Sequence, residues 1–175
     1  PPRSTPLYSS AASDVYKRQQ IGYYSRNRYE VYEPRTFITS SYYGNLGYEY
    51  PTALGAKVAR PDKPVVAVIG DGGFMFNVQE LSTAVKHNIN AIAIVFNDNA
   101  FGNVLRDQKT MFENREYGAR VVNPDFMKLA DAFGVRGVRV KGGASELQSA
   151  LEEAIGIEAP SLIEVPVGEM PNPLR

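Results

Sequence analysis

The chain has 175 residues, of which 43% are hydrophobic and 22% charged, and its formal net charge at pH 7 is zero. This length allows one domain with a buried core, and the balanced charge gives no electrostatic case for a nucleic-acid or membrane partner. No apolar run reaches the roughly 20 residues of a membrane-spanning helix. The absence of cysteine excludes disulfides, thiolate metal ligands and a cysteine nucleophile, and it fits a cytoplasmic location.

Residues 1–19, PPRSTPLYSSAASDVYKRQ, have no hydrophobic period and no link to the sequence that follows. They resemble the translation of a sequencing-library adaptor with its transposon end. We therefore expect a non-native, disordered segment here and exclude it from fold prediction. A natural disordered N-terminus is the alternative. The domain is then expected to occupy residues 20–175, truncated on its N-terminal side.

In the first half of the chain the sequence predicts a short helix and loop at 20–34, a strand at 35–40, a turn-rich loop at 41–50, a helix at 51–59, a strand at 65–69, a helix at 78–87 and a strand at 91–96. A loop with some helix is expected at 103–122, followed by a helix that Asn123 and Pro124 open as cap and first residue and that runs to Phe133. The remaining elements are a short strand ending near Val140, a helix at 144–155 and a strand at 162–167. The strands at 65–69 and 91–96 are continuous apolar runs, which is typical of burial on both faces. This alternation predicts an α/β fold with a doubly wound, mostly parallel sheet and helices on both faces.

Two of the apolar strands end in polar residues. Gly70-Asp71-Gly72-Gly73 follows the first, and Asn97-Asp98-Asn99 follows the second. If these strands are neighbours, Asp71 and Asp98 converge at the carboxyl edge of the sheet, where such folds bind ligands. Carboxylate oxygens suit Mg²⁺ or Ca²⁺ better than Zn²⁺.

The glycines at the end of the first strand indicate an anion-binding site. Gly72 and Gly73 allow backbone N–H groups to approach an anion, and the helix expected to begin near Asn77 adds its positive end. The two strand ends together predict a metal-bridged diphosphate. The alternative is an ordinary Asp-Gly turn after a strand.

Gly70-Asp71-Gly72, followed after a helix and a strand by Asn97-Asp98, resembles the thiamine-diphosphate motif of the acetolactate synthase and benzoylformate decarboxylase superfamily. That motif is GDG, a spacer of this length, and usually NN. The likeness extends from Gln20 to the C-terminus and includes TSSYYGNLGYEYPTALGAK and SLIEVPV. It implies a thiamine-diphosphate-binding fold with thiamine diphosphate and Mg²⁺ as cofactors.

The resemblance also implies roles for individual residues. Asp71 and Asp98 would bind the metal through their side chains and Ala100 through its carbonyl, with Asp98 standing where the motif usually has asparagine. The residues expected at the diphosphate are Gly70, Gly72, Gly73, Phe101, Gly102 and Gln20.

The GNLG segment would carry the aminopyrimidine through Gly44, Asn45 and Leu46. In this resemblance the Gly44 carbonyl accepts from the 4′-amino group, and Leu46 wedges between the two rings. An ordinary core leucine is the alternative for Leu46.

The implied function is that of a 2-oxo acid decarboxylase or carboligase. In this superfamily the activating glutamate comes from a separate pyrimidine-binding domain of the same or a partner subunit, in a homodimer or tetramer. We place no catalytic residue on this chain and expect the chain alone to be inactive.

Two alternatives stay open. The cofactor-binding subunit of a 2-oxo acid oxidoreductase shares the motif, but such subunits usually carry cluster-binding cysteines, which are absent here. A non-catalytic nucleotide-binding module would require G-x-G-x-x-G, and GDGGFMF lacks the third glycine at that spacing.

Overall fold

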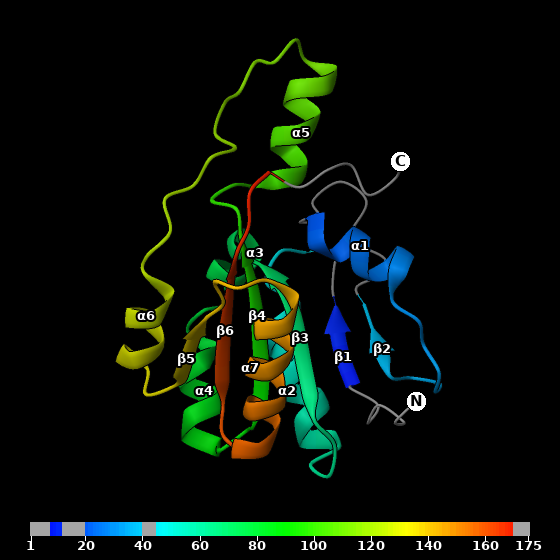
Figure 1. Cartoon of the computed structure of the whole chain (residues 1–175), viewed down its shortest axis with the longest axis vertical. Coiled ribbons are helices and arrows are strands. Elements are labelled where there is room, and N and C mark those ends of the chain that lie inside the picture. Colours follow the sequence, from blue (N-terminus) through cyan, green and yellow to red (C-terminus); the bar gives the residue numbers. More distant parts are fainter. Residues whose placement is uncertain (1–7, 12–19, 40–44, 170–175) are drawn as a thin grey trace.

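The two continuous apolar strands lie side by side in a parallel sheet (Figure 1). The computed structural model describes residues 8–11, 20–39 and 45–169. The strands in these ranges are β1 (Tyr8–Ala11), β2 (Phe37–Ile38), β3 (Val65–Gly70), β4 (Ala91–Asn97), β5 (Arg136–Arg139) and β6 (Ser161–Pro166). The helices are α1 (Gln20–Arg28), α2 (Glu49–Ala59), α3 (Asp71–Phe76), α4 (Glu80–His87), α5 (Gly102–Met111), α6 (Phe126–Ala132) and α7 (Ala144–Ile157).

The sheet order is β2-β1-β3-β4-β6-β5, and every neighbouring pair is parallel. Val65 lies opposite Ala91 and Gly70 opposite Phe96, so β3 and β4 end next to each other. The residues that follow these two strands therefore emerge together at the carboxyl edge of the sheet.

Alternate residues of β3 serve two separate cores. Val65, Ala67 and Ile69 pack with α2, α3, α4 and α6, whereas Val66 and Val68 pack with α7. Figure 1 shows α7 in front of the sheet with α2 and α4 behind it. The predicted class, a doubly wound parallel sheet with helices on both faces, is confirmed.

Helix α3 is held by an aromatic contact on each side. The Phe74 ring meets the rings of Tyr50 and Phe126 edge-on, each with centroids 5.9 Å apart. All three side chains are almost fully buried. Because Asp71 opens this helix, the packing of Phe74 fixes where the Asp71 carboxylate lies.

The disorder expected of residues 1–19 stays a prediction, and within this segment the structure describes only Tyr8–Ala11. These residues form β1 between β2 and β3, with Ser9 opposite both Phe37 and Val66. Parallel pairing uses main-chain groups, and β2 and β3 each present an edge at this place, so a segment with no hydrophobic pattern can fill it. The adaptor-like origin of the segment stays a prediction.

Several boundaries differ from the predicted ones. Helix α2 begins at Glu49, which places Pro51 in its first turn, where no N–H is needed. Strand β2 has only two residues in the described part of its predicted range, and α5 supplies the helix expected within 103–122. No helix in the described ranges has the length and apolar character to cross a membrane.

Candidate metal and cofactor site

Asp71 and Asp98 meet at the carboxyl edge of the sheet. Asp71 directly follows β3 and is 1% exposed, and Asp98 directly follows β4 and is half-buried. Their carboxyl groups lie close enough for each to act on the pKa of the other. The adjacency of the strand ends thus brings the two side chains together, while their role as metal ligands stays a prediction.

The environment of this pair disfavours negative charge. Burial is the main cause that raises the pKa of both carboxyl groups, and the pKa of Asp98 reaches about 7 with the charge of Asp71 as the second cause. Hydrogen bonds from the Asn123 side chain and the Gly72 N–H act in the opposite direction on the Asp71 pKa. No lysine or arginine of the described residues forms an ion pair with either carboxylate.

The turn after β4 is built from side chains that accept main-chain hydrogen bonds. Asn97 Oδ1 accepts from the Asn99 N–H at 3.3 Å, and Asp98 Oδ1 accepts from the Ala100 N–H at 3.2 Å. Asn99 has φ +54°, a conformation that asparagine tolerates better than most residues. Ala100 is 2% exposed, so its carbonyl sits in a tightly fixed turn.

The chain leaves this turn, forms α5, which projects beyond the sheet in Figure 1, and then returns. On its return it pairs with the turn: Phe101 N–H donates to the Ala119 carbonyl at 2.7 Å, and Val121 N–H donates to the Asn99 carbonyl at 2.9 Å. The Phe101 N–H is therefore used within the protein. Gly102 is buried as the first residue of α5.

Asn123 is a site residue that the sequence did not reveal. Its Nδ2 donates to Asp71 Oδ2 at 2.6 Å, to Asn97 Oδ1 at 3.0 Å and to Asn99 Oδ1 at 3.3 Å. The prediction that Asn123 caps the following helix is wrong, because Asp125 caps α6 by accepting from the Met127 N–H at 3.0 Å. An Asn-Pro pair before a helix is typical of a helix cap. Only the path of the returning chain shows that the Asn123 side chain instead donates to Asp71.

The glycine turn differs from its prediction in one respect. A helix, α3, begins at Asp71 rather than near Asn77, so Gly72 and Gly73 are buried within it. The Gly72 N–H donates to Asp71 Oδ1 at 2.8 Å. In this structure Gly72 orients the carboxylate, and the expected contacts of Gly70, Gly72 and Gly73 with a diphosphate stay predictions.

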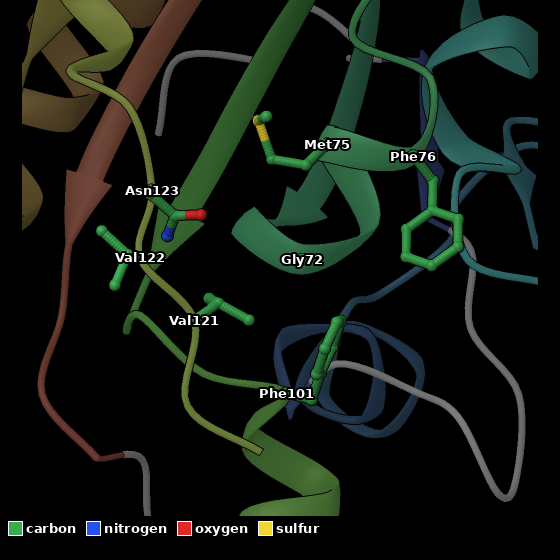
Figure 2. A pocket seen from close by; sticks show the side chains of 7 residues that line it. All are labelled: Gly72, Met75, Phe76, Phe101, Val121, Val122 and Asn123. Atoms are coloured by element: carbon green, nitrogen blue, oxygen red, sulfur yellow. The ribbon is translucent and has the colours of Figure 1, made fainter. Parts of the chain in front are cut away.

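A cavity of about 350 Å³ adjoins the glycine turn. Figure 2 shows α3 on one side and Phe101 with the returning segment on the other. Its lining residues are Gly72, Met75, Phe76, Phe101, Val121, Val122 and Asn123. The cavity therefore has largely apolar walls and a polar end at Gly72 and Asn123.

Gly47, the last residue of GNLG, contacts the end of α3. Gly47 has φ +85°, and its carbonyl accepts from Asn77 Nδ2 at 2.7 Å. Leu46 is half-buried and is not among the cavity-lining residues, and Asn45 is exposed. Gly44 lies outside the described residues. The expected contact of Gln20 also lies outside them, because only its backbone, at the start of α1, is described.

With this geometry in place, comparison with known proteins defines the class. Residues 20–165 match the family model of the thiamine pyrophosphate enzyme, C-terminal TPP binding domain, and the chain belongs to this family. It is 39% identical over 79% of its length to the acetolactate synthase isozyme 2 large subunit of Escherichia coli. It is 42% identical over 75% of its length to the mitochondrial acetolactate synthase catalytic subunit of Aspergillus candidus. A third relative, the acetolactate synthase large subunit of Haemophilus influenzae, is 36% identical over 89% of the chain.

The chain spans only part of these relatives. It covers 25%, 19% and 27% of their respective lengths. The family match supports a thiamine-diphosphate site over a dinucleotide-binding module, and these three relatives are acetolactate synthases rather than oxidoreductase subunits.

Proposed function

We propose that this chain binds Mg²⁺–thiamine diphosphate and supplies the diphosphate half of the active site of a 2-oxo acid decarboxylase or carboligase. The observation that carries the proposal is the proximity of two carboxyl groups at adjacent strand ends, the buried Asp71 and the half-buried Asp98, each of which acts on the pKa of the other. Without a cation this proximity costs free energy, because burial and mutual repulsion both oppose ionisation.

The donor set fits a hard divalent cation. Two carboxylates and the Ala100 carbonyl offer only oxygen, and the described residues contain no cluster of three or more histidine, cysteine or acidic side chains. Mg²⁺ commonly binds through one or two carboxylates and completes its shell with water and substrate phosphates. A diphosphate would therefore be held mainly through the metal.

The chain's own residues would bind and orient the metal and the cofactor. Asn123 and the Gly72 N–H hold the two oxygens of Asp71, and the Asn97–Ala100 turn holds Asp98. The apolar cavity beside Gly72 offers a wall of Met75 and Phe101 for an aromatic ring. Thiamine diphosphate, when bound, supplies the electron sink that loss of CO₂ from a 2-oxo acid requires.

The remaining parts of the site are expected elsewhere. We propose that a pyrimidine-binding domain, on the same or a partner subunit of a homodimer or tetramer, provides the activating glutamate. The acetolactate synthase names of the relatives support 2-oxo acids as substrates. This chain alone is accordingly expected to bind cofactor without turning over 2-oxo acids.

The test is calorimetric titration of the 175-residue chain with thiamine diphosphate, with and without Mg²⁺, and with NAD. We expect binding of thiamine diphosphate that requires Mg²⁺, and no binding of NAD. Asp71→Asn should reduce the affinity by about 100-fold, because it removes a ligand charge and turns an amide toward the Asn123 donor.

Asp62→Asn is the matched control, because Asp62 is an exposed carboxylate paired with Arg60 away from the sheet edge. It should bind like the wild type. Binding that persists in Asp71→Asn, or that needs no metal, would refute the proposed site.

A further inference from the structure

A ring of contacts leads from the candidate site to the surface of the domain, and it consists of hydrogen bonds and the short main-chain link between Asn123 and Asp125. Asn97 Nδ2 donates to Glu164 Oε1 at 2.8 Å, and Arg139 Nε donates to Glu164 Oε2 at 2.6 Å. Arg139 Nη2 then donates to Asp125 Oδ1 at 2.6 Å. Asn123, two residues before Asp125, closes the ring by donating to Asn97 Oδ1 at 3.0 Å.

Glu164 is the buried centre of this ring. It lies on β6 and is 3% exposed, and both of its oxygens accept hydrogen bonds. A buried carboxylate is tolerated where a cation and further donors compensate its charge. Arg139 on β5 supplies the charge, and Asn97 at the end of β4 supplies the second donor.

The ring determines which way the Asn97 amide points. An ionised carboxylate can only accept, so Glu164 selects the NH₂ side of that amide. Asn97 Oδ1 is thereby turned to the other side, where it accepts from the Asn99 N–H and from Asn123. Reversal of the amide would place two donors against each other at Asn123 and two acceptors at Glu164.

We propose that Glu164 and Arg139 are positioning residues for the metal site. Through the Asn97 amide they hold the turn that carries Asp98 and Ala100, and they hold Asn123 against Asp71. This inference rests on the proposed function, since it concerns the affinity of the site for its metal and cofactor. Neither residue contacts the metal ligands directly.

A purely structural role would give a different pattern of effects. Arg139→Met leaves the Glu164 charge buried without its partner and should destabilise the fold. Replacement of both members, in Arg139→Met/Glu164→Met, removes the uncompensated charge and should restore much of the stability. A structural role predicts that cofactor affinity returns with stability. A positioning role predicts that affinity stays low, because Asn97 has still lost its acceptor.

The experiment measures thermal unfolding and calorimetric binding of Mg²⁺–thiamine diphosphate on the full chain. Arg136→Met is the control, because Arg136 lies on the same strand and pairs with the exposed Glu153, away from the ring. We expect the affinity of Arg139→Met and of the double variant to fall about 10-fold, as is usual when a support of a metal site is lost. The affinity of Arg136→Met should equal that of the wild type.

The outcomes separate this inference from the function on which it rests. If the wild-type chain binds no Mg²⁺–thiamine diphosphate, the proposed function fails and the inference fails with it. If the wild type binds and the double variant binds equally well, the inference alone is overturned. The double variant also keeps the test decisive should Arg139→Met fail to fold.

Discussion

The Asp98 carboxyl group has a pKa raised to about 7 against an ordinary value of 3.8, through burial first and the charge of Asp71 second. A folded-state pKa above the unfolded one means that the folded chain holds this proton more tightly. The corresponding stability is fully present below pH 3.8 and is lost as the pH rises through about 7.

Asp98→Asn should therefore flatten the fall in stability of the metal-free chain between pH 5 and pH 8, as measured by urea unfolding at each pH. Part of the slope should remain, because burial also raises the pKa of Glu49 to about 7. Asp62→Asn, which changes an exposed carboxylate whose pKa Arg60 lowers, should leave the slope unchanged. An unaltered slope in Asp98→Asn would show that neither burial nor the charge of Asp71 raises the Asp98 pKa.

At this scale the sequence could predict Asp71 and Asp98 but not Asn123. The two acids each follow a continuous apolar strand, and parallel neighbours end at one edge, so a local pattern suffices. Asn123 lies 52 residues from Asp71 and reaches it only because the chain returns after α5. That return depends on main-chain hydrogen bonds of Asn99 and Phe101, which no sequence pattern predicts.

The contact between the GNLG segment and α3 depends on Gly47. A Cβ on Gly47 would lie 2.6 Å from Asn77 Nδ2 and 2.9 Å from Phe76 Cβ, and its φ of +85° is unfavourable for other residues. Gly47→Ala should cost about 2 to 4 kcal/mol of unfolding free energy, from backbone strain together with overpacking. Chemical denaturation measures this loss.

Gly118→Ala is the matched control for the backbone effect. Gly118 has φ +62°, and a Cβ there would meet nothing within 4 Å. It should cost only about 1 kcal/mol, which is the strain alone. Equal losses in the two variants would mean that the GNLG segment does not press on α3.

The elements with strong patterns were predictable, and α3 was not. Glycine in a helix costs about 1 kcal/mol relative to alanine, so Gly72 and Gly73 favour the prediction of a turn. Burial of Phe74 between Tyr50 and Phe126 overrides that preference, and those two residues come from α2 and α6. The site is thus shaped by contacts between elements, which local propensity does not contain.

At the scale of the whole molecule, the sheet is continuous through β1. Ser10 lies opposite Ile38 on one side and Ala67 on the other, so its main chain pairs within the interior of the sheet. Ser10→Pro removes a ladder donor and should cost about 3 kcal/mol in thermal or urea unfolding. Ser10→Ala keeps the backbone donor and should cost much less. Equal stability of the two variants would contradict the placement of β1.

The alternation of strands and helices predicted the layers and the parallel sheet, because buried strands and amphipathic helices have distinct periods. It did not predict that Tyr8–Ala11 would enter the sheet. That strand pairs with β2 on one side and β3 on the other, and no local sequence pattern indicates such pairing between distant segments.

The central claim is that one cation sits between Asp71 and Asp98 and holds a diphosphate. Crystals of the chain grown with Mn²⁺ and thiamine diphosphate, and examined for anomalous scattering from manganese, test it most directly. We expect a single manganese peak in contact with both carboxylates and with the diphosphate oxygens. Thiamine diphosphate bound with the manganese elsewhere, or with the two carboxylates turned apart, would contradict the claim.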